Sequence, residues 1–350
     1  MERVLARARS DKSLARFDRI ALVLSGGGAL GAYQAGAYAG LEQCGVRPNW
    51  LAGTGIGAVN AAIVAGSLPH ERVARLRYFW QELSRCAATR TSRPTEQRSG
   101  AASGGWAWWR RVSGSAAEAD QPIVPARLLR ELVEQVVDFD RVNSGAVRLV
   151  LGAANLATGA ETFFDNDRHV IAPDHVLAST ALAGLPPVTI DGQRYGGSAI
   201  SVAALDDARP ADTLCFVVDG YDPVPGARGG ISRSAREIAA LRRNHDLRRM
   251  IALLGERLPA GLRGDPDIRK CLAEGSGATM TILHLVHEGN AADLGAKIID
   301  LSTATVMRRW QAGETDVITG LAHPRWLAPP PRRLGVVVHE LRGGVAAPPR

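Results

Sequence analysis

The feature that most constrains the fold is a glycine-rich turn between an apolar strand and a helix. The run Ile20–Leu24 is short, continuous and apolar, as is typical of a buried strand, and the glycines of "SGGGALG" follow it directly. Helical periodicity then covers Leu30–Gln43. A second strand over Asn49–Ala52, a tight turn and a second helix over Ile56–Ala65 repeat this order. The pattern predicts an α/β fold with a mostly parallel central sheet.

Helices and strands continue to alternate along the rest of the chain. A short helix, a Pro-Pro bend and a hairpin turning at Asp191-Gly192 are expected in "APDHVLASTALAGLPPVTIDGQRYGG". The other expected elements are helices at Glu71–Cys86, Val124–Val137 and Ser232–Leu258, a helix ending at Arg309, and strands at Ala146–Ala154, Glu161–Asp165, Thr213–Asp219, Thr279–His287 and Gly335–Leu341.

Changes in composition suggest how the chain is divided. A basic segment covers residues 1–18, and the Ser-, Gly- and Arg-rich stretch 87–122 predicts a mobile loop or lid. The Gly- and Pro-rich "YDPVPGARGG" places a boundary near Gly229. We therefore expect a first domain over 19–228, a C-terminal module over 229–342 and a disordered tail over 343–350.

The charge balance favours anionic partners. The net charge is +7 and arginine carries it almost alone, because Lys12, Lys270 and Lys297 are the only lysines. Such a surface suits phosphate or anionic lipid, although the base composition of a genome can also enrich arginine. No long uncharged apolar run is present, and charges interrupt the N-terminal segment. These features predict a cytoplasmic protein, with peripheral contact at the inner membrane as an option.

The glycine loop predicts an anion or oxyanion site. The amides of Gly26, Gly27 and Gly28 can converge at a helix N-terminus with no side chain in the way. The same loop also satisfies the G-x-G-x-x-G pattern of dinucleotide-binding proteins. That alternative needs an acidic residue after the second strand, and "NWLAGTG" contains none. Neither a cofactor nor a metal is expected, since the cysteines and histidines lack a ligand spacing.

The stretch Gly53-Thr54-Gly55-Ile56-Gly57 lies at a strand-to-helix turn, where a nucleophile elbow would place its reactive residue. With "SGGGALGAYQAG", it resembles the bacterial patatin-like phospholipase family. The resemblance extends through "DHVLASTALAGLPPVTIDGQRYGG", and "RRNHDLRRMIALL" to "HPRWL" resembles the extra C-terminal module of some members. It implies a three-layer α/β fold, a glycine-loop oxyanion hole completed by the amide of Ile56, and a Ser-Asp dyad that cleaves lipid acyl esters without a cofactor.

The same resemblance implies that both dyad residues are missing. The serine position is Gly55, and the aspartate position of the Asp-Gly-Gly motif is Tyr195. A phenol with an ordinary pKa near 10 is a poor base at neutral pH. Loss of the nucleophile typically lowers the rate of a hydrolase by about 10⁶. We therefore expect a pseudoenzyme that retains acyl-chain or anionic-lipid binding.

Two alternatives to this hypothesis remain open. An active hydrolase could use a relocated dyad, for which Thr54, Ser25 and Asp191 are the nearest candidates, although an Asp-Gly sequence is also typical of a hairpin turn. A scaffold could instead bind protein partners through the C-terminal module. The aromatic and basic loop around Trp106, Trp108 and Trp109 could lie at a membrane interface or pack on the domain. No nucleic-acid partner is expected.

Overall fold

A computed structural model describes residues 14–91, 124–180, 185–198, 202–205, 210–219, 233–287, 300–342 and 345–346. Its centre is a ten-stranded sheet with the order β10-β9-β8-β7-β1-β2-β3-β6-β5, and β4 pairs with β3 outside this path. The strands are β1 (Arg19–Leu24), β2 (Trp50–Gly53), β3 (Arg148–Asn155), β4 (Glu161–Asp165), β5 (Val188–Ile190), β6 (Gln193–Gly197), β7 (Thr213–Asp219), β8 (Met280–Val286), β9 (Val336–Arg342) and β10 (Val345–Ala346).

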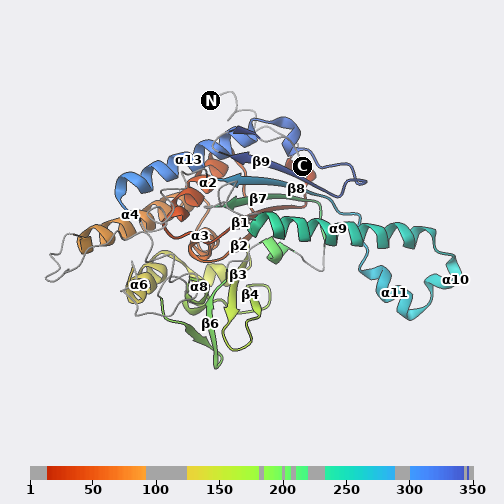
Figure 1. Cartoon of the computed structure of the whole chain (residues 1–350), viewed down its shortest axis with the longest axis horizontal. Coiled ribbons are helices and arrows are strands. Elements are labelled where there is room, and N and C mark those ends of the chain that lie inside the picture. Colours follow the sequence, from red (N-terminus) through yellow and green to blue (C-terminus); the bar gives the residue numbers. More distant parts are fainter. Residues whose placement is uncertain are drawn as a thin grey trace, which may run out of the picture.

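The six strands from β9 to β3 are mutually parallel, while β4, β5, β6 and β10 pair antiparallel. Helices cover both faces of the sheet (Figure 1). The α-helices are α2 (Gly31–Gln43), α3 (Ile56–Ala65), α4 (Arg72–Thr91), α6 (Ala126–Val136), α7 (Phe139–Asn143), α8 (Pro173–Thr180), α9 (Arg233–Arg257), α10 (Ala260–Arg263), α11 (Pro266–Ala273) and α13 (Thr303–Leu321). The 3₁₀ turns are η1 (Leu14–Arg16), η2 (Gly28–Leu30), η3 (Val202–Leu205) and η5 (Pro324–Leu327).

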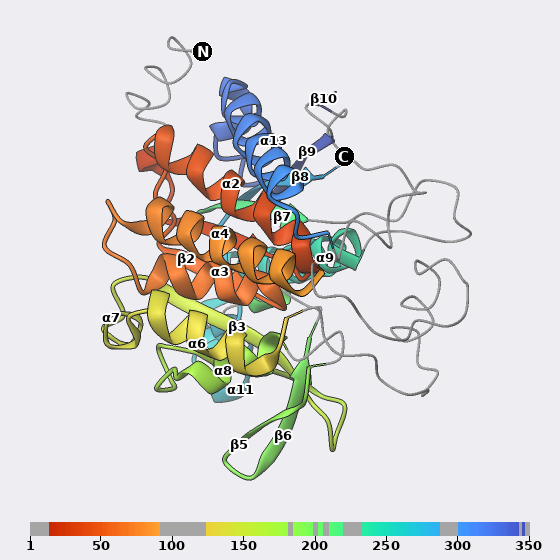
Figure 2. The same ribbon diagram turned by 90° about the vertical axis from the view of Figure 1, so that its left-hand side faces the viewer.

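Alternation along β1 divides the core into two layers. Leu22 and Leu24 point to the larger core, which is built with α2, α3, α4, α6, α8 and α13. Ala21 and Val23 point to a smaller core built with α9 and η3. Figure 2 shows the larger group of helices in front of the sheet and α9 behind it. The fold is the three-layer α/β arrangement that the sequence predicts.

Most expected elements form close to their expected bounds, and α3, β4 and β7 match theirs. Three differences stand out. Helix α4 continues to Thr91, into the stretch expected to be a loop, and residues 92–123 lie outside the described part of the chain. Helix α13 continues to Leu321, well past the expected end at Arg309, because Val317 and Leu321 prolong its buried face. Strand β10 pairs with β9 inside the tail that was expected to be disordered.

The C-terminal part of the chain extends the same sheet rather than forming another. Strand β8 pairs in parallel with β7, and β9 with β8. Helix α13 crosses close to α2, because a Cβ added to Gly36 would lie 1.9 Å from the carbonyl oxygen of Trp310 and one added to Gly313 would lie 2.0 Å from that of Tyr33. The two helices can approach this closely only where glycine removes the side chain.

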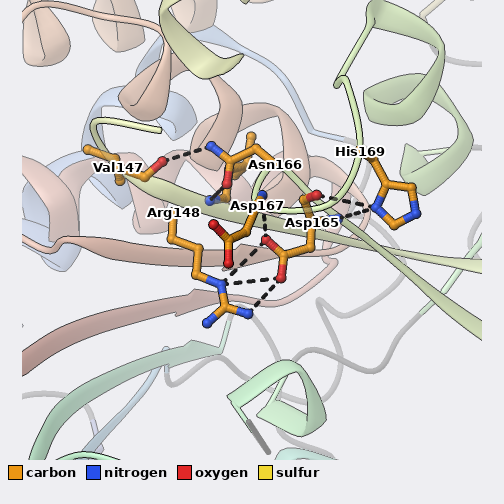
Figure 3. Close-up of polar contacts among 7 residues, drawn as sticks. Val147, Arg148, Asp165, Asn166, Asp167 and His169 are labelled. Carbon is orange, nitrogen blue, oxygen red and sulfur yellow. Dashed lines mark hydrogen bonds and ion pairs between the residues drawn. The ribbon is translucent and has the colours of Figure 1, made fainter. Parts of the chain in front are cut away.

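A polar cluster fixes the pairing of β3 and β4 at the amino end of β3 (Figure 3). The guanidinium of Arg148 donates to the buried carboxylate of Asp165 at 2.6 Å, and Asn166 Nδ2 donates to the carbonyl of Val147 at 2.9 Å. The Arg148 guanidinium also lies 4.5 Å from the centre of the Trp50 ring. Since Trp50 begins β2 and Gly53 ends it, this cluster is at the opposite end of the sheet from the predicted elbow.

Candidate active site

Gly55 lies at the turn between β2 and α3, with φ 56° and ψ −135°. This positive φ is one that residues with side chains rarely adopt, and it is the strained conformation expected at an elbow. The flanking glycines allow strand and helix to meet. A Cβ on Gly53 would lie 2.6 Å from the Gly57 carbonyl oxygen, and one on Gly57 would lie 2.1 Å from that of Leu24.

The glycine loop after β1 faces this elbow across a very short gap. A Cβ built on Gly55 would lie 2.9 Å from the Cα of Gly26. In the described part of the chain, no hydrogen bond is made by the amides of Gly26 and Gly27. Gly28 and Ile56 begin η2 and α3, so their amides belong to the free N–H groups at a helix start. The arrangement provides donors and two helix N-termini that favour a negatively charged group.

Tyr195 lies in β6, opposite Asn155 of β3, and its ring packs against Phe164 with the centroids 5.2 Å apart. The side chain is half-buried at the edge of the larger core. Helix α8 contacts both α3 and β6, and the Ser179 carbonyl at its end accepts the Gly55 amide at 3.0 Å. The Tyr195 ring thus packs on Phe164 at the edge of the larger core.

The other residues considered for a relocated dyad are spread over three places. Thr54 is fully buried, and its hydroxyl has no hydrogen-bond partner in the described part of the chain. Asp191 is exposed in the β5–β6 turn, where its φ of 49° fits a hairpin. Ser25, directly after β1, is 9% exposed and makes a Ser-Asp contact that the sequence did not reveal.

The partner of Ser25 is Asp219, the last residue of β7. Ser25 Oγ donates to Asp219 Oδ1 at 2.5 Å and Ser234 Oγ donates to the same oxygen at 2.8 Å. His284 Nε2 lies 2.7 Å from Asp219 Oδ2. Burial alone would raise the pKa of Asp219, but the hydrogen bond and attraction of His284 and the two serine hydroxyls outweigh it and lower the pKa. Asp219 is thus a buried carboxylate in its ionised form.

Further buried polar side chains hold the glycine loop in place. Gln34 of α2 donates to the carbonyl of Ser25. Asn60 of α3 donates to the Gly31 carbonyl at 2.9 Å and receives a hydrogen bond from the Trp80 indole at 3.0 Å. Every member of this chain of contacts is buried, so the loop is fixed from α2, α3 and α4 together.

A cavity of about 440 Å³ lies between α6, α8 and the segment leading into β5. Its lining includes Thr180, the residue after Ser179, whose carbonyl holds the elbow amide. The lining is mainly apolar, and Arg130 and Asp174 form an ion pair on it. The apolar lining residues include Leu129, Leu177, Leu185, Pro186, Pro187 and Val188.

A family model described as patatin-like phospholipase matches residues 22–221, more than half of the chain. The chain belongs to the patatin-like phospholipase family. A second model, described as patatin phospholipase, matches residues 231–333 of this patatin-like protein. The crystal structure of VipD from Legionella pneumophila is similar at 12% identity and a TM-score of 0.31, over 84% of this chain and 67% of that chain. A TM-score this low adds nothing to the family match. Among curated proteins no match was found.

The contacts of this patatin-like protein that sequence reasoning missed centre on Asp219. One signal was available, because Asp219 is the last residue of an apolar strand and therefore had to lie at the carboxyl edge of a parallel sheet. Strand β7 neighbours β1 on the side opposite β2, so Asp219 and Ser25 flank the point where the strand order reverses. The pairing of β7 with β1 is long-range, and no local pattern gives it.

The described residues also bear on the expectations about metals and membranes. Among these residues, no group of three or more histidine, cysteine, aspartate or glutamate side chains is arranged to hold a metal. None of their helices is long and apolar enough to cross a membrane. Trp106, Trp108 and Trp109 lie outside the described residues.

Proposed function

We propose that this patatin-like protein binds a lipid acyl chain, or the anionic group attached to it, without hydrolysing it. The observation that carries this proposal is Gly55, which occupies the apex of the elbow and has no side chain to attack an ester. Tyr195, at the position of the base in the family motif, has its ring packed against Phe164. Neither half of a Ser-Asp dyad is therefore present where the family would use it.

Two features support binding without reaction. The amides of Gly26 and Gly27, with those at the starts of η2 and α3, offer hydrogen bonds to an oxyanion or a carboxylate. The cavity of about 440 Å³ has the size of a small-molecule pocket, for which roughly 300–1,000 Å³ is usual, and its lining residue Thr180 follows Ser179, whose carbonyl accepts the Gly55 amide. We place the acyl chain in this cavity and its polar end at the glycine loop.

A second candidate function is an active hydrolase that uses Ser25 and Asp219, since their 2.5 Å contact is a Ser-Asp pair next to the glycine loop. Two observations weigh against it. Ser25 is 9% exposed, so an ester has little access to its hydroxyl. The lowered pKa of Asp219 also makes this carboxylate a weak base, because its negative charge is already stabilised by several donors.

Other parts of the hypothesis rest on the sequence alone. They are the division into a domain over 19–228 and a module over 229–342, a scaffold role for that module, a cytoplasmic location, and peripheral contact with the inner membrane through Trp106, Trp108 and Trp109. The first family match ends at residue 221 and the second begins at residue 231, so Gly229 lies between them. A scaffold role alone would predict no binding of lipid.

The test is binding of a fluorescent fatty acid, with fluorophosphonate labelling measured in parallel. We expect the wild-type chain to bind the fatty acid and to remain unlabelled. Thr189→Trp, at the exposed rim of the cavity, should weaken binding about tenfold or more by filling the site, whereas Ala157→Trp in the exposed β3–β4 turn should not. Stoichiometric labelling that Ser25→Ala abolishes would establish the second candidate. Equal binding of the fatty acid by both tryptophan variants would refute the cavity as its binding site.

A further inference from the structure

The helices beyond the sheet form a projecting arm with an exposed apolar stripe. We define the helical arm as residues 242–278, which comprise the second half of α9 together with α10 and α11 (Figure 1). No residue from 246 to 278 is buried. Of the eleven large apolar side chains exposed in the described residues, five lie on this arm: Leu247, Met250, Leu253, Leu254 and Leu262. So dense a patch on a projecting element marks an interaction surface.

Four of these side chains share one face of α9. At 3.6 residues per turn, Leu247, Met250 and Leu254 are stacked along the helix and Leu253 flanks them. They are between 48% and 63% exposed. The opposite side of α9 is covered, since Gly255 packs against Leu272 of α11 and Ala252 lies against Gly275. The apolar stripe is therefore the outer face of the arm.

Basic residues stand at both ends of the stripe. Arg243 precedes Leu247 by one turn and Arg257 follows Leu253 by one turn, and both are exposed. The arm as a whole carries eight basic and five acidic residues. An apolar face flanked by arginines matches a surface that combines negative headgroups with an apolar interior.

The positions of these arginines argue against a second copy of the chain as the occupant. In an antiparallel pair of α9 helices centred on Met250, Arg243 of one copy would lie opposite Arg257 of the other. In a parallel pair, each arginine would lie opposite itself. Both arrangements bring like charges together along the seam, which opposes association.

We propose that the helical arm docks on an anionic lipid surface, with Leu247, Met250, Leu253 and Leu254 entering the headgroup region and Arg243 and Arg257 contacting lipid phosphates. Within the arm, Arg249 donates to the backbone carbonyl of Arg333, so the docked helix is attached directly to the loop before β9. This docking is independent of whether the elbow carries out chemistry.

The experiment is flotation of the full chain with vesicles of phosphatidylcholine alone and of equal parts phosphatidylcholine and phosphatidylglycerol. We expect wild-type protein to float with the anionic vesicles. Combined Leu247→Gln and Leu254→Gln should lower the partition coefficient about tenfold or more, because two leucine side chains no longer leave water. Combined Arg243→Gln and Arg257→Gln should remove the preference for anionic vesicles.

Control variants outside the arm show whether the loss of vesicle binding is specific to the arm. Met307→Gln on α13 removes an apolar side chain that is 50% exposed, and combined Arg47→Gln and Arg85→Gln removes two exposed charges elsewhere. Both should float as wild type does, and all variants should keep the wild-type circular dichroism. Failure of wild type to bind either vesicle would overturn the proposal. Wild-type flotation by the arm variants would overturn it too, as would an arm-dependent dimer in light scattering without vesicle binding.

Discussion

At the scale of single residues, Gly55 adopts a backbone conformation at the turn between β2 and α3 that favours glycine. Its φ of 56° costs a glycine little, whereas a serine would be strained there. Here the glycine loop also lies closer than a serine would allow, because the Cα of Gly26 is 2.9 Å from the point that a Cβ on residue 55 would occupy. The residue thus relieves backbone strain and lets the loop close onto the elbow.

We expect Gly55→Ser to lower the free energy of unfolding by more than Gly159→Ser does. Gly159 has a φ of 70° with nothing within 4 Å of its Cβ position, so its substitution should cost only the backbone term, about 1–2 kcal/mol. Gly55→Ser adds the contact with Gly26, which should cost roughly a further 1–3 kcal/mol. Urea unfolding of both variants measures the difference. Equal losses in the free energy of unfolding would show that the glycine loop moves away from the new side chain without cost.

A double variant tests whether residues 55 and 195 occupy the serine and aspartate positions of the family dyad. Gly55→Ser combined with Tyr195→Asp should recover measurable hydrolysis of short-chain esters, because it restores a serine and an aspartate at the two family positions of the dyad. Each single variant is the control and should remain inactive. A double variant that folds but does not hydrolyse the esters would contradict the assignment of the base position to residue 195.

At the scale of elements, the sequence predicted what local pattern determines. The apolar run before the glycines defines β1, and the Asp191-Gly192 turn defines the β5–β6 hairpin. The length of α13 escaped prediction because Val317 is buried by a helix from the opposite end of the chain. The close packing of α13 against α2 depends on Gly36 and Gly313. In a sequence, a glycine within a helix indicates low helix propensity and does not reveal a helix–helix contact.

Helix packing provides the element-scale prediction. Gly36→Ala should lower the free energy of unfolding by more than about 3 kcal/mol, because its methyl group would lie 1.9 Å from the Trp310 carbonyl oxygen and the two backbones would have to separate. Gly320→Ala, in α13, is the matched control, since the nearest atom to its Cβ position is 3.7 Å away. It should be neutral or stabilise by up to about 1 kcal/mol. Thermal unfolding of both variants gives the comparison, and a tolerated Gly36→Ala would contradict the close crossing.

At the scale of the whole molecule, Asp219 joins the two regions that the family models match separately. It ends β7 in the first region and accepts hydrogen bonds from Ser25 of that region and from Ser234 of the second, and it pairs with His284 of β8. Composition suggested a boundary near Gly229, but no local signal could reveal that one buried carboxylate spans it. The shared sheet and this carboxylate predict that both regions unfold together.

Asp219→Asn should therefore lower the free energy of unfolding of the entire chain at pH 7, by about 3–5 kcal/mol, in a single transition. The native pKa of Asp219 is lowered, so the wild-type contribution is present above the unfolded pKa of about 3.9 and is lost as the pH falls through the lower native value. Urea unfolding between neutral pH and pH 3 should consequently show a shallower acid dependence for Asp219→Asn than for wild type. Asp140→Asn, at an exposed site, should stay within about 0.5 kcal/mol of wild type. An unchanged acid slope would show that Asp219 is not held ionised, and two separate transitions would show that the regions fold independently.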